Sequence, residues 1–265
     1  MIQQQTKILW NRPLGIDCVH LGLACGQGLE DSVPGQFVMV RVGDGSAPLL
    51  RRPFSISGLV GNPDKPDGIE LLVKAVGEGT RALAQMGPGT VVNLIGPLGH
   101  GFRIPKESGP IYLAAGGIGV APIRFLATEL VKRGARPDHL RLFLGGRSRH
   151  DLLCRDHFES LGIEVTVTTD DGSDGDQCLL TDPLELAIAQ LRPDVVFACG
   201  PHGMLACVAG IAERLAVPCQ ISLETLMACG LGACLGCAVA PKKPGDPYLH
   251  ACVNGPVFDS QDLVL

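Results

Sequence analysis

The sequence predicts a β + α/β protein, in which an N-terminal antiparallel β-barrel is followed by a parallel-sheet domain and a small cysteine-rich region. Two observations support this fold class. Near residue 105 the apolar pattern changes from closely spaced short strands to strands that alternate with helices, and four cysteines lie between residues 229 and 252. We therefore expect three units, at residues 1–104, 105–223 and 224–265.

The first unit contains short apolar segments typical of antiparallel strands. They lie at residues 36–42, 54–60, 69–76 and 91–96, with turn residues between them and one predicted helix at 80–86. Strands at this spacing, with so little helix, favour a small barrel.

Two motifs of the predicted barrel suit a phosphate group. In RRPFSIS, Arg52 supplies a cation beside the extended Pro53, while Phe54 and Ser55 offer an apolar face and a hydroxyl. By themselves these residues also fit an ordinary exposed strand end.

The second motif is VGEGT, in which Gly77 and Gly79 precede Thr80 at the start of the predicted helix. Glycines let amide groups approach a ligand closely, and a helix N-terminus favours an anion. Alone, this motif is better explained as a glycine turn capped by Thr80. Together, the two motifs describe opposite sides of one pyrophosphate.

The second unit alternates strands and helices, which is typical of a parallel sheet covered by helices. The predicted strands are 111–115, 140–146, 164–169, 195–200 and 219–223, and the predicted helices are 122–133, 152–161, 183–191 and 204–215.

The carboxyl ends of two of these strands carry glycine turns. LAAGGIGVAPI places Gly116, Gly117 and Gly119 between the first strand and a helix, with Pro122 at the first helical position. The motif departs from Gly-x-Gly-x-x-Gly, but its place in the fold is where parallel sheets bind nucleotides. FACGP brings Cys199 and Gly200 to the same rim, although Cys199 also fits a small buried apolar residue.

Arg147 and Arg149 follow the second strand of this unit, where a ribose is often bound. They either contact a 2′-phosphate or face water, which leaves NAD and NADP both open.

The third unit is too short and too rich in glycine for an ordinary core, so a metal centre is expected to organise it. Cys229, Cys234 and Cys237 form the pattern C-x4-C-x2-C, and Cys252 follows. This pattern contains the plant-type 2Fe-2S spacing, whereas structural zinc sites usually pair their cysteines in two short knuckles. The spacing favours an iron-sulfur cluster over zinc.

Composition limits the function classes. The 265-residue chain is 46% hydrophobic but has no apolar run long enough to span a membrane, and its start does not fit a secretory signal. We expect a cytoplasmic protein whose 11 cysteines are thiols or metal ligands. The net charge of -5 argues against nucleic acid as a partner.

Six motifs occur in the order found in ferredoxin reductase-like flavoproteins: RRPFSIS, VGEGT, GPLGHGF, AAGGIGVAPI, CGP and MACGLGACLGC. The chain resembles this superfamily over essentially its whole length. Its cysteine region is most similar to that of the electron transfer subunits of B-type dihydroorotate dehydrogenases. The resemblance implies an FAD-binding barrel, an NAD-binding α/β domain and a C-terminal 2Fe-2S cluster.

The resemblance also implies roles for particular residues. The flavin and its pyrophosphate would be held by Arg52, Pro53, Phe54, Ser55, Leu72, Val73, Lys74, Gly79 and Thr80. Phe54 stands where the family has tyrosine, so a hydroxyl contact is lost. The nicotinamide nucleotide would be bound by Gly116, Gly117, Gly119, Cys199 and Gly200, and the cluster by Cys229, Cys234, Cys237 and Cys252.

The activity implied is an electron relay in pyrimidine biosynthesis, with no acid–base catalytic residue in this chain. Electrons would come from a separate FMN-containing catalytic subunit, pass the cluster and FAD, and leave to NAD+. Two subunits of each kind would form a heterotetramer.

Two alternatives stay open at this point. One is the flavin and iron-sulfur subunit of a ferredoxin:NADP oxidoreductase or a sulfhydrogenase-type complex, some of which lack a cysteine at the position of Cys229. The other is a zinc-stabilised interaction protein without redox activity.

Overall fold

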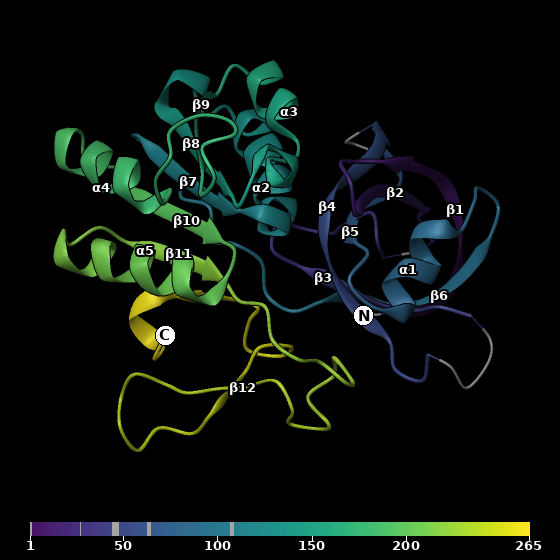
Figure 1. Cartoon of the computed structure of the whole chain (residues 1–265). Helices are drawn as coiled ribbons and strands as arrows, with labels where there is room; N and C mark the ends of the chain where they lie inside the picture. The colour runs from purple at the N-terminus through teal and green to yellow at the C-terminus, as the bar shows by residue number, and fades with distance from the viewer. Residues whose placement is uncertain (1, 27, 44–47, 63–64, 107–108) are drawn as a thin grey trace.

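The structure, a computed structural model, describes residues 2–26, 28–43, 48–62, 65–106 and 109–265. Figure 1 shows the barrel and the parallel-sheet domain side by side, with the C-terminal residues running along the edge of the sheet and beneath the joint between them. The predicted fold class is confirmed. No helix within the described ranges is long and apolar enough to cross a membrane.

The barrel is closed by six strands in the order β1-β2-β5-β4-β3-β6. Its elements are β1 Ile2–Pro13, β2 Cys18–Ala24, β3 Phe37–Arg41, β4 Arg52–Asn62, β5 Lys65–Lys74, α1 Glu78–Gln85 and β6 Val91–Leu98. Four of the strands had been predicted, and β1 and β2 had not. β1 opens with the polar run Gln3, Gln4 and Gln5, which hides the strand pattern.

The second domain contains a six-stranded sheet in the order β14-β11-β10-β7-β8-β9. Its strands are β7 Ile111–Gly116, β8 Leu140–Gly146, β9 Glu164–Thr169, β10 Val195–Cys199, β11 Cys219–Ser222 and β14 Val257–Asp259. The helices are α2 Val120–Lys132, α3 Arg155–Ser160, α4 Thr181–Gln190 and α5 His202–Arg214, with short 3-10 turns η1 Gly117–Gly119, η2 Pro137–His139, η3 Arg149–Asp151 and η4 Ser260–Asp262.

The predicted helix starts differ from those of the structure by two or three residues, and two of these differences concern motif residues. α1 begins at Glu78, so Thr80 lies inside its first turn. α2 begins at Val120, which puts Pro122 inside the helix and not at its first position. A proline is tolerated there because the first N–H groups of a helix have no partner within it.

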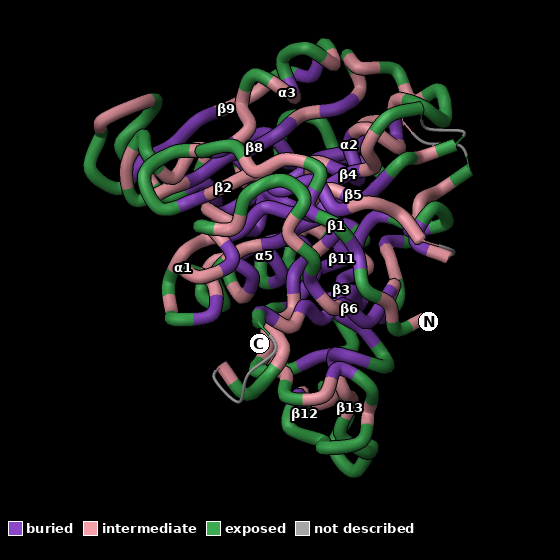
Figure 2. The backbone as a smooth tube through the Cα atoms, turned by 90° about the vertical axis from the view of Figure 1, so that its right-hand side faces the viewer, coloured by how far each residue is buried: buried purple, intermediate pink, exposed green. Residues whose placement is uncertain are grey.

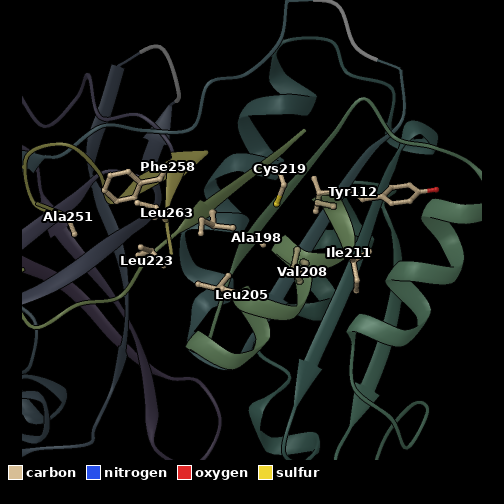
Figure 3. Close-up of a cluster of buried hydrophobic side chains, with 14 of the residues drawn as sticks. Tyr112, Ala198, Leu205, Val208, Ile211, Cys219, Leu223, Ala251, Phe258 and Leu263 are labelled. Atoms are coloured by element: carbon tan, nitrogen blue, oxygen red, sulfur yellow. The ribbon is translucent and has the colours of Figure 1, made fainter. Parts of the chain in front are cut away.

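The C-terminal region does not stand apart from the second domain. β14 pairs antiparallel with β11 at the edge of the sheet. Ala251, Phe258 and Leu263 are buried in one apolar cluster with Leu205 and Val208 of α5, as Figure 3 shows. The hairpin of β12 Ala238–Val239 and β13 Leu249–His250 packs on the edge of this core through Val239 and Leu249, and Figure 2 shows mostly exposed loops around it.

Candidate functional site

The four predicted cluster ligands lie in two pairs. Cys237 and Cys252 are buried, and their sulfur atoms are 3.2 Å apart. Cys229 and Cys234 are nearer the surface and hydrogen-bonded to each other through their side chains. The fold thus brings all four thiols of the motif to one loop and its neighbour.

Backbone amides point at two of these sulfur atoms. The amide of Leu231 donates to Cys229 Sγ at 3.3 Å, and that of Gly232 donates to Cys252 Sγ at 3.2 Å. The first of these bonds is the main reason why the pKa of the Cys229 thiol falls to about 6, which favours the thiolate. Burial instead raises the pKa of the Cys252 thiol to about 11.

The loop can make these contacts because three residues adopt the left-handed backbone region. Gly230 and Gly232 have φ of 72° and 78°, and Leu235 has φ of 58°. A Cβ on Gly232 would lie 2.7 Å from Val253 Cγ2, so only glycine fits there. Glycine therefore serves both the turn and the close approach of the loop to Val253.

The donor set fits a 2Fe-2S cluster. Such a cluster takes four cysteine thiolates, two for each iron, and the thiols come in two pairs. Within the part of the chain that the structure describes, no three or more His, Cys, Asp or Glu side chains are gathered as one metal ion would require. The two pairs of thiols match the four-cysteine donor set of a binuclear centre.

The cysteine loop packs directly on the barrel. A Cβ on Gly230 would lie 2.6 Å from Met39 Cγ of β3 and 3.5 Å from Leu98 Cδ1 of β6. Met39, Leu98, Cys237 and Cys252 belong to the same buried apolar cluster. The loop that carries the predicted cluster ligands thus contacts the barrel domain through Gly230.

The two barrel motifs, RRPFSIS and VGEGT, meet in the structure. A Cβ on Gly79 would lie 3.2 Å from Arg52 Nε and 3.3 Å from Arg52 Cζ, so the guanidinium rests on the first turn of α1. Arg52 also donates to the Leu50 carbonyl. A cation beside a helix N-terminus is an arrangement that favours an anion.

Thr80 has a mainly local role in this site. Its Oγ1 accepts a hydrogen bond from the Gly77 amide at 2.9 Å and donates to the Gly77 carbonyl at 3.1 Å. The hydroxyl therefore fixes the turn that presents Gly79.

The other predicted flavin residues lie on β4 and β5. Pro53 and Ser55 are half-buried, and Phe54 belongs to the buried cluster of the barrel. Leu72 and Val73 are both buried, with Val73 in the barrel core and Leu72 in a cluster shared with the second domain.

Lys74 ends β5 and reaches across to the second domain. Its Nζ lies 3.2 Å from Asp151 Oδ1. A cavity of about 200 Å³ lies between β5 and the loop of Gly117–Gly119, and its lining includes Lys74, Asp151, Gly117 and Ile118. This cavity lies where the two halves of the expected site meet.

The glycines of the second domain bring two loops into backbone contact. A Cβ on Gly119 would lie 2.4 Å from the Cys199 carbonyl oxygen, and one on Gly200 would lie 3.1 Å from the Gly116 nitrogen. Gly117 has φ of 53°. β7 and β10 are neighbours, so both predicted motifs lie at the same rim of the sheet.

Cys199 itself is buried, and burial raises the pKa of its thiol to about 12. The thiol is therefore protonated, and the alternative interpretation of Cys199 as a packing residue agrees with this environment.

Arg147 and Arg149 are exposed and lie against an acidic loop. The amide of Asp171 donates to the Arg147 carbonyl at 3.1 Å, and the amide of Arg149 donates to Ser173 Oγ at 2.8 Å. The pKa of the Asp171 carboxyl is lowered mainly by its hydrogen bonds with Ser173, with a smaller contribution from the charge of Arg149.

Sequence reasoning missed a buried polar group where α2 crosses the barrel. Arg124 Nη1 lies 2.5 Å from Glu70 Oε2 and 2.8 Å from the Ser57 carbonyl. The one signal available was Gly58, because a lone glycine inside a strand often marks a bulge.

Comparison with known proteins agrees with this geometry. Residues 224–264 match the iron-sulfur cluster binding domain of dihydroorotate dehydrogenase B, and residues 113–210 match the oxidoreductase NAD-binding domain. The chain is 39% identical over 235 residues to the electron transfer subunit of dihydroorotate dehydrogenase B (NAD(+)) from Desulforamulus reducens, covering 88% of this chain and 87% of that one. The corresponding subunit from Bacillus mycoides is 36% identical over 271 residues and 100% of both chains.

A solved structure of an NADH-dependent reduced ferredoxin-NADP oxidoreductase superposes with a TM-score of 0.84 at 26% identity, covering 98% of this chain and 89% of that one. A ferredoxin NADP+ reductase from Neisseria gonorrhoeae, at 18% identity and a TM-score of 0.66 over 80% of this chain and 91% of that one, shares the fold.

The barrel, the parallel sheet and the C-terminal cysteine loop define an oxidoreductase of the ferredoxin reductase-like class, with an iron-sulfur region added at its end. Relatives at 35–39% identity narrow this class further. The chain belongs to the family of electron transfer subunits of dihydroorotate dehydrogenase B. The ferredoxin:NADP oxidoreductase alternative is not better supported than this family.

Proposed function

We propose that this chain passes electrons from an FMN-containing dihydroorotate dehydrogenase subunit to NAD+ in the cytoplasm, in an assembly of two subunits of each kind. The observation that carries the proposal is the cysteine loop, whose four thiols lie in a segment that packs on the barrel carrying the flavin motifs. The name shared by the relatives supports a separate catalytic partner.

For FAD, we propose that Arg52 and the amides around Gly79 hold the pyrophosphate, with Thr80 fixing that turn. Ser55 and the strand residues Pro53, Phe54, Leu72, Val73 and Lys74 would form the wall along the ring system. The close approach of the Arg52 guanidinium to Gly79 supports this assignment.

For NAD, we propose the rim formed by Gly116, Gly117, Gly119 and Gly200, with Cys199 as a buried support. Backbone contact between these two loops leaves their amides at the carboxyl ends of parallel strands, where such sheets bind nucleotides. Cys229, Cys234, Cys237 and Cys252 would hold the cluster.

The cofactors supply the redox chemistry when bound: a flavin exchanges hydride with nicotinamide and single electrons with an iron-sulfur centre. The residues of this chain bind and orient them. The amides of Leu231 and Gly232 stabilise thiolates at Cys229 and Cys252. The apolar cluster around Cys237 and Cys252 excludes water from the inner side of the loop.

The outer side of the loop is proposed as the surface that meets the FMN-containing subunit. Leu226 is 90% exposed and Leu235 59% exposed, and Leu231 and Val253 are exposed beside them. Leu235 also holds φ of 58°, a conformation that costs a leucine free energy. Exposed apolar side chains grouped around a redox loop fit a protein interface that keeps the electron-transfer distance short.

The functional division we propose follows the three expected units, with FAD in 1–104, NAD in 105–223 and the cluster in 224–265. The third unit shares its core with the second through β14, so the division concerns cofactors and not independent folding.

The test is an anaerobic visible spectrum of the purified chain with iron, sulfide, zinc and flavin analysis. We expect FAD with two irons and two sulfides per chain. Cys234→Ser should lose the cluster absorbance and keep FAD, while Cys207→Ser, on the exposed side of α5, should lose neither. Zinc without flavin, or unchanged iron in Cys234→Ser, would contradict the proposal.

A further inference from the structure

The joint between the barrel and α2 contains a notch built for one side chain. Along the β4/β5 ladder the pairing moves from Ile56 opposite Leu71 to Gly58 opposite Glu70, so Ser57 is an extra residue in a β-bulge. The Ser57 carbonyl points away from the ladder and accepts a hydrogen bond from Arg124 Nη1 at 2.8 Å.

The absence of a side chain at Gly58 leaves room for the guanidinium in this notch. A Cβ on Gly58 would lie 2.8 Å from Arg124 Nη1 and 3.1 Å from Glu70 Oε2. The bulge, the missing side chain and the carbonyl thus form a seat on the barrel for a guanidinium that comes from the other domain.

The charge of Arg124 is balanced inside the seat. The side chains of Arg124 and Glu70 are each 14% exposed, and their closest atoms are 2.5 Å apart. Glu70 Oε2 also lies 2.9 Å from His20 Nε2 of β2. The pKa of Glu70 is lowered despite burial because His20 and Arg124 stabilise its carboxylate.

Of the groups that α3 brings near Arg124, Arg155 and Asp156 are charged and line the same cavity as Arg124. His157 of α3 bonds Thr128 at 3.0 Å, and burial and the charge of Arg124 lower its pKa to about 4. Phe125, next to Arg124, is buried in the barrel cluster. The ionic pair and an apolar anchor therefore hold α2 on the barrel at adjacent positions.

The residues on both sides of this contact are close in sequence to the proposed cofactor-binding motifs. Ser57 follows Ser55 on β4, and Glu70 precedes Leu72 on β5. Arg124 lies on α2, which begins directly after the loop of Gly117 and Gly119. A shift of Arg124 in its seat would move the nucleotide loop relative to the flavin strands.

We propose that Arg124, seated in the β4 bulge on Glu70, is a positioning residue that sets the nicotinamide loop against the flavin-binding strands for hydride transfer. This inference rests on the proposed function. Because hydride transfer depends steeply on the separation of the reacting atoms, a small displacement would slow it without abolishing the binding of either cofactor.

The experiment uses the purified holo chain and the variants Arg124→Met, Glu70→Gln, the double variant and Arg124→Lys. NADH is mixed rapidly with the oxidised protein, and the loss of flavin absorbance counts the hydrides, each a proton with an electron pair, that NADH delivers. Flavin content, the dissociation constant of NADH and the unfolding temperature are measured alongside. Arg133→Gln is the matched control, since Arg133 follows the same helix and pairs with Glu129 on the surface.

We expect Arg124→Met to slow flavin reduction by about tenfold or more while flavin content and NADH affinity change by less than about threefold. The double variant removes the stranded Glu70 charge, so it should recover thermal stability but not the rate. Arg124→Lys keeps the charge but not the forked geometry and should be slowed to an intermediate degree. The chain has a single tryptophan, Trp10, whose ring centroid lies 4.6 Å from that of His20. Because His20 pairs with Glu70, the tryptophan fluorescence should change in the Glu70 and Arg124 variants only.

A rate that returns with stability in the double variant would show a merely structural pair and overturn the proposal, as would an unchanged rate in Arg124→Met. If Arg124→Met does not fold, the double variant and Arg124→Lys decide, and wild-type rates in both would overturn it. A wild-type chain that lacks flavin or does not bind NADH would instead contradict the proposed function.

Discussion

The proposed flavin site and the proposed nicotinamide site use different means to face a phosphate. On the barrel, a permanent cation, Arg52, rests on the first turn of α1 at Gly79. In the second domain, Gly119 and Gly200 bring the loops after β7 and β10 together through backbone atoms. A charged clamp suits a cofactor that stays bound, whereas a rim of amides suits a nucleotide that must leave after each turnover.

The largest effect is expected from Gly119→Ala, which should weaken nucleotide binding at the second domain and leave the flavin site intact. The new Cβ would lie 2.4 Å from the Cys199 carbonyl oxygen, in a place where only backbone can give way. Overpacking of this kind costs about 1–3 kcal/mol of stability. The displaced amides should weaken NADH binding by about a hundredfold or more, while flavin content is retained. Thermal unfolding and NADH titration measure the two effects.

Gly203→Ala on α5 is the control for that change, because a Cβ there meets no atom within 4 Å. Its stability should stay equal or rise by about 0.5–1 kcal/mol. Equal NADH affinity in Gly119→Ala and wild type would show that the rim is not the nucleotide site.

The second-largest effect is expected from Arg52→Met, which removes the cation from the clamp that Arg52 and Gly79 form on the barrel. Removal of a charged donor from the pyrophosphate should cost about 1.5–3 kcal/mol, which is about ten- to a hundredfold in flavin affinity. Flavin retained after dialysis and a titration with FAD measure the loss. Arg81→Met, on the exposed side of α1, should keep the flavin, and flavin retained equally in both variants would contradict the clamp.

These two sites also show what the sequence could and could not predict. Each motif is local, so the sequence could predict that Arg52 and Gly79 meet, that the rim glycines share one edge of the sheet, and that the four cysteines lie together. The joint was not predictable in this way. Ser57, Glu70 and Arg124 are far apart in sequence and meet only after the barrel has closed and α2 has docked.

Two of the strands that the sequence did not predict, β1 and β14, also depend on contacts between segments that are distant in sequence. β1 opens with three glutamines and gains its pattern only by pairing with β2 and β6. β14 is a three-residue strand whose burial depends on β11 beside it. Short or polar segments acquire strand character from their neighbours, which a local pattern cannot reveal.

A smaller effect on the clamp is expected from Gly79→Ala. The added Cβ would lie 3.2 Å from Arg52 Nε, but a guanidinium at the end of a flexible side chain can move aside. Flavin affinity should fall by about threefold, and helix stability should rise by about 0.5–1 kcal/mol, because alanine favours a helix over glycine. Gly77→Ala meets no atom within 4 Å and should leave flavin affinity unchanged. If Gly79→Ala lost as much flavin affinity as Arg52→Met, the backbone at Gly79 would itself contact the flavin closely, and the proposed dominant role of Arg52 would be contradicted.

The smallest effect concerns which nucleotide the rim accepts, and it is expected from Asp171→Asn. Arg147 and Arg149 would attract a 2′-phosphate, but the Asp171 loop is hydrogen-bonded to both residues and its carboxylate faces Arg149. Asparagine keeps the shape and the bond to the Ser173 amide while it removes the charge. NADPH affinity should therefore rise by about threefold, the size typical of an exposed charge pair, and NADH affinity should stay nearly constant. Because the interaction is exposed, the gain should shrink as salt is added.

Asp138→Asn, whose partner Arg136 lies before β8 at the opposite end of that strand, should change neither affinity. A rise in NADPH affinity that is equal in both variants would reflect net charge alone, and the acidic loop would then have no part in the choice between NAD and NADP.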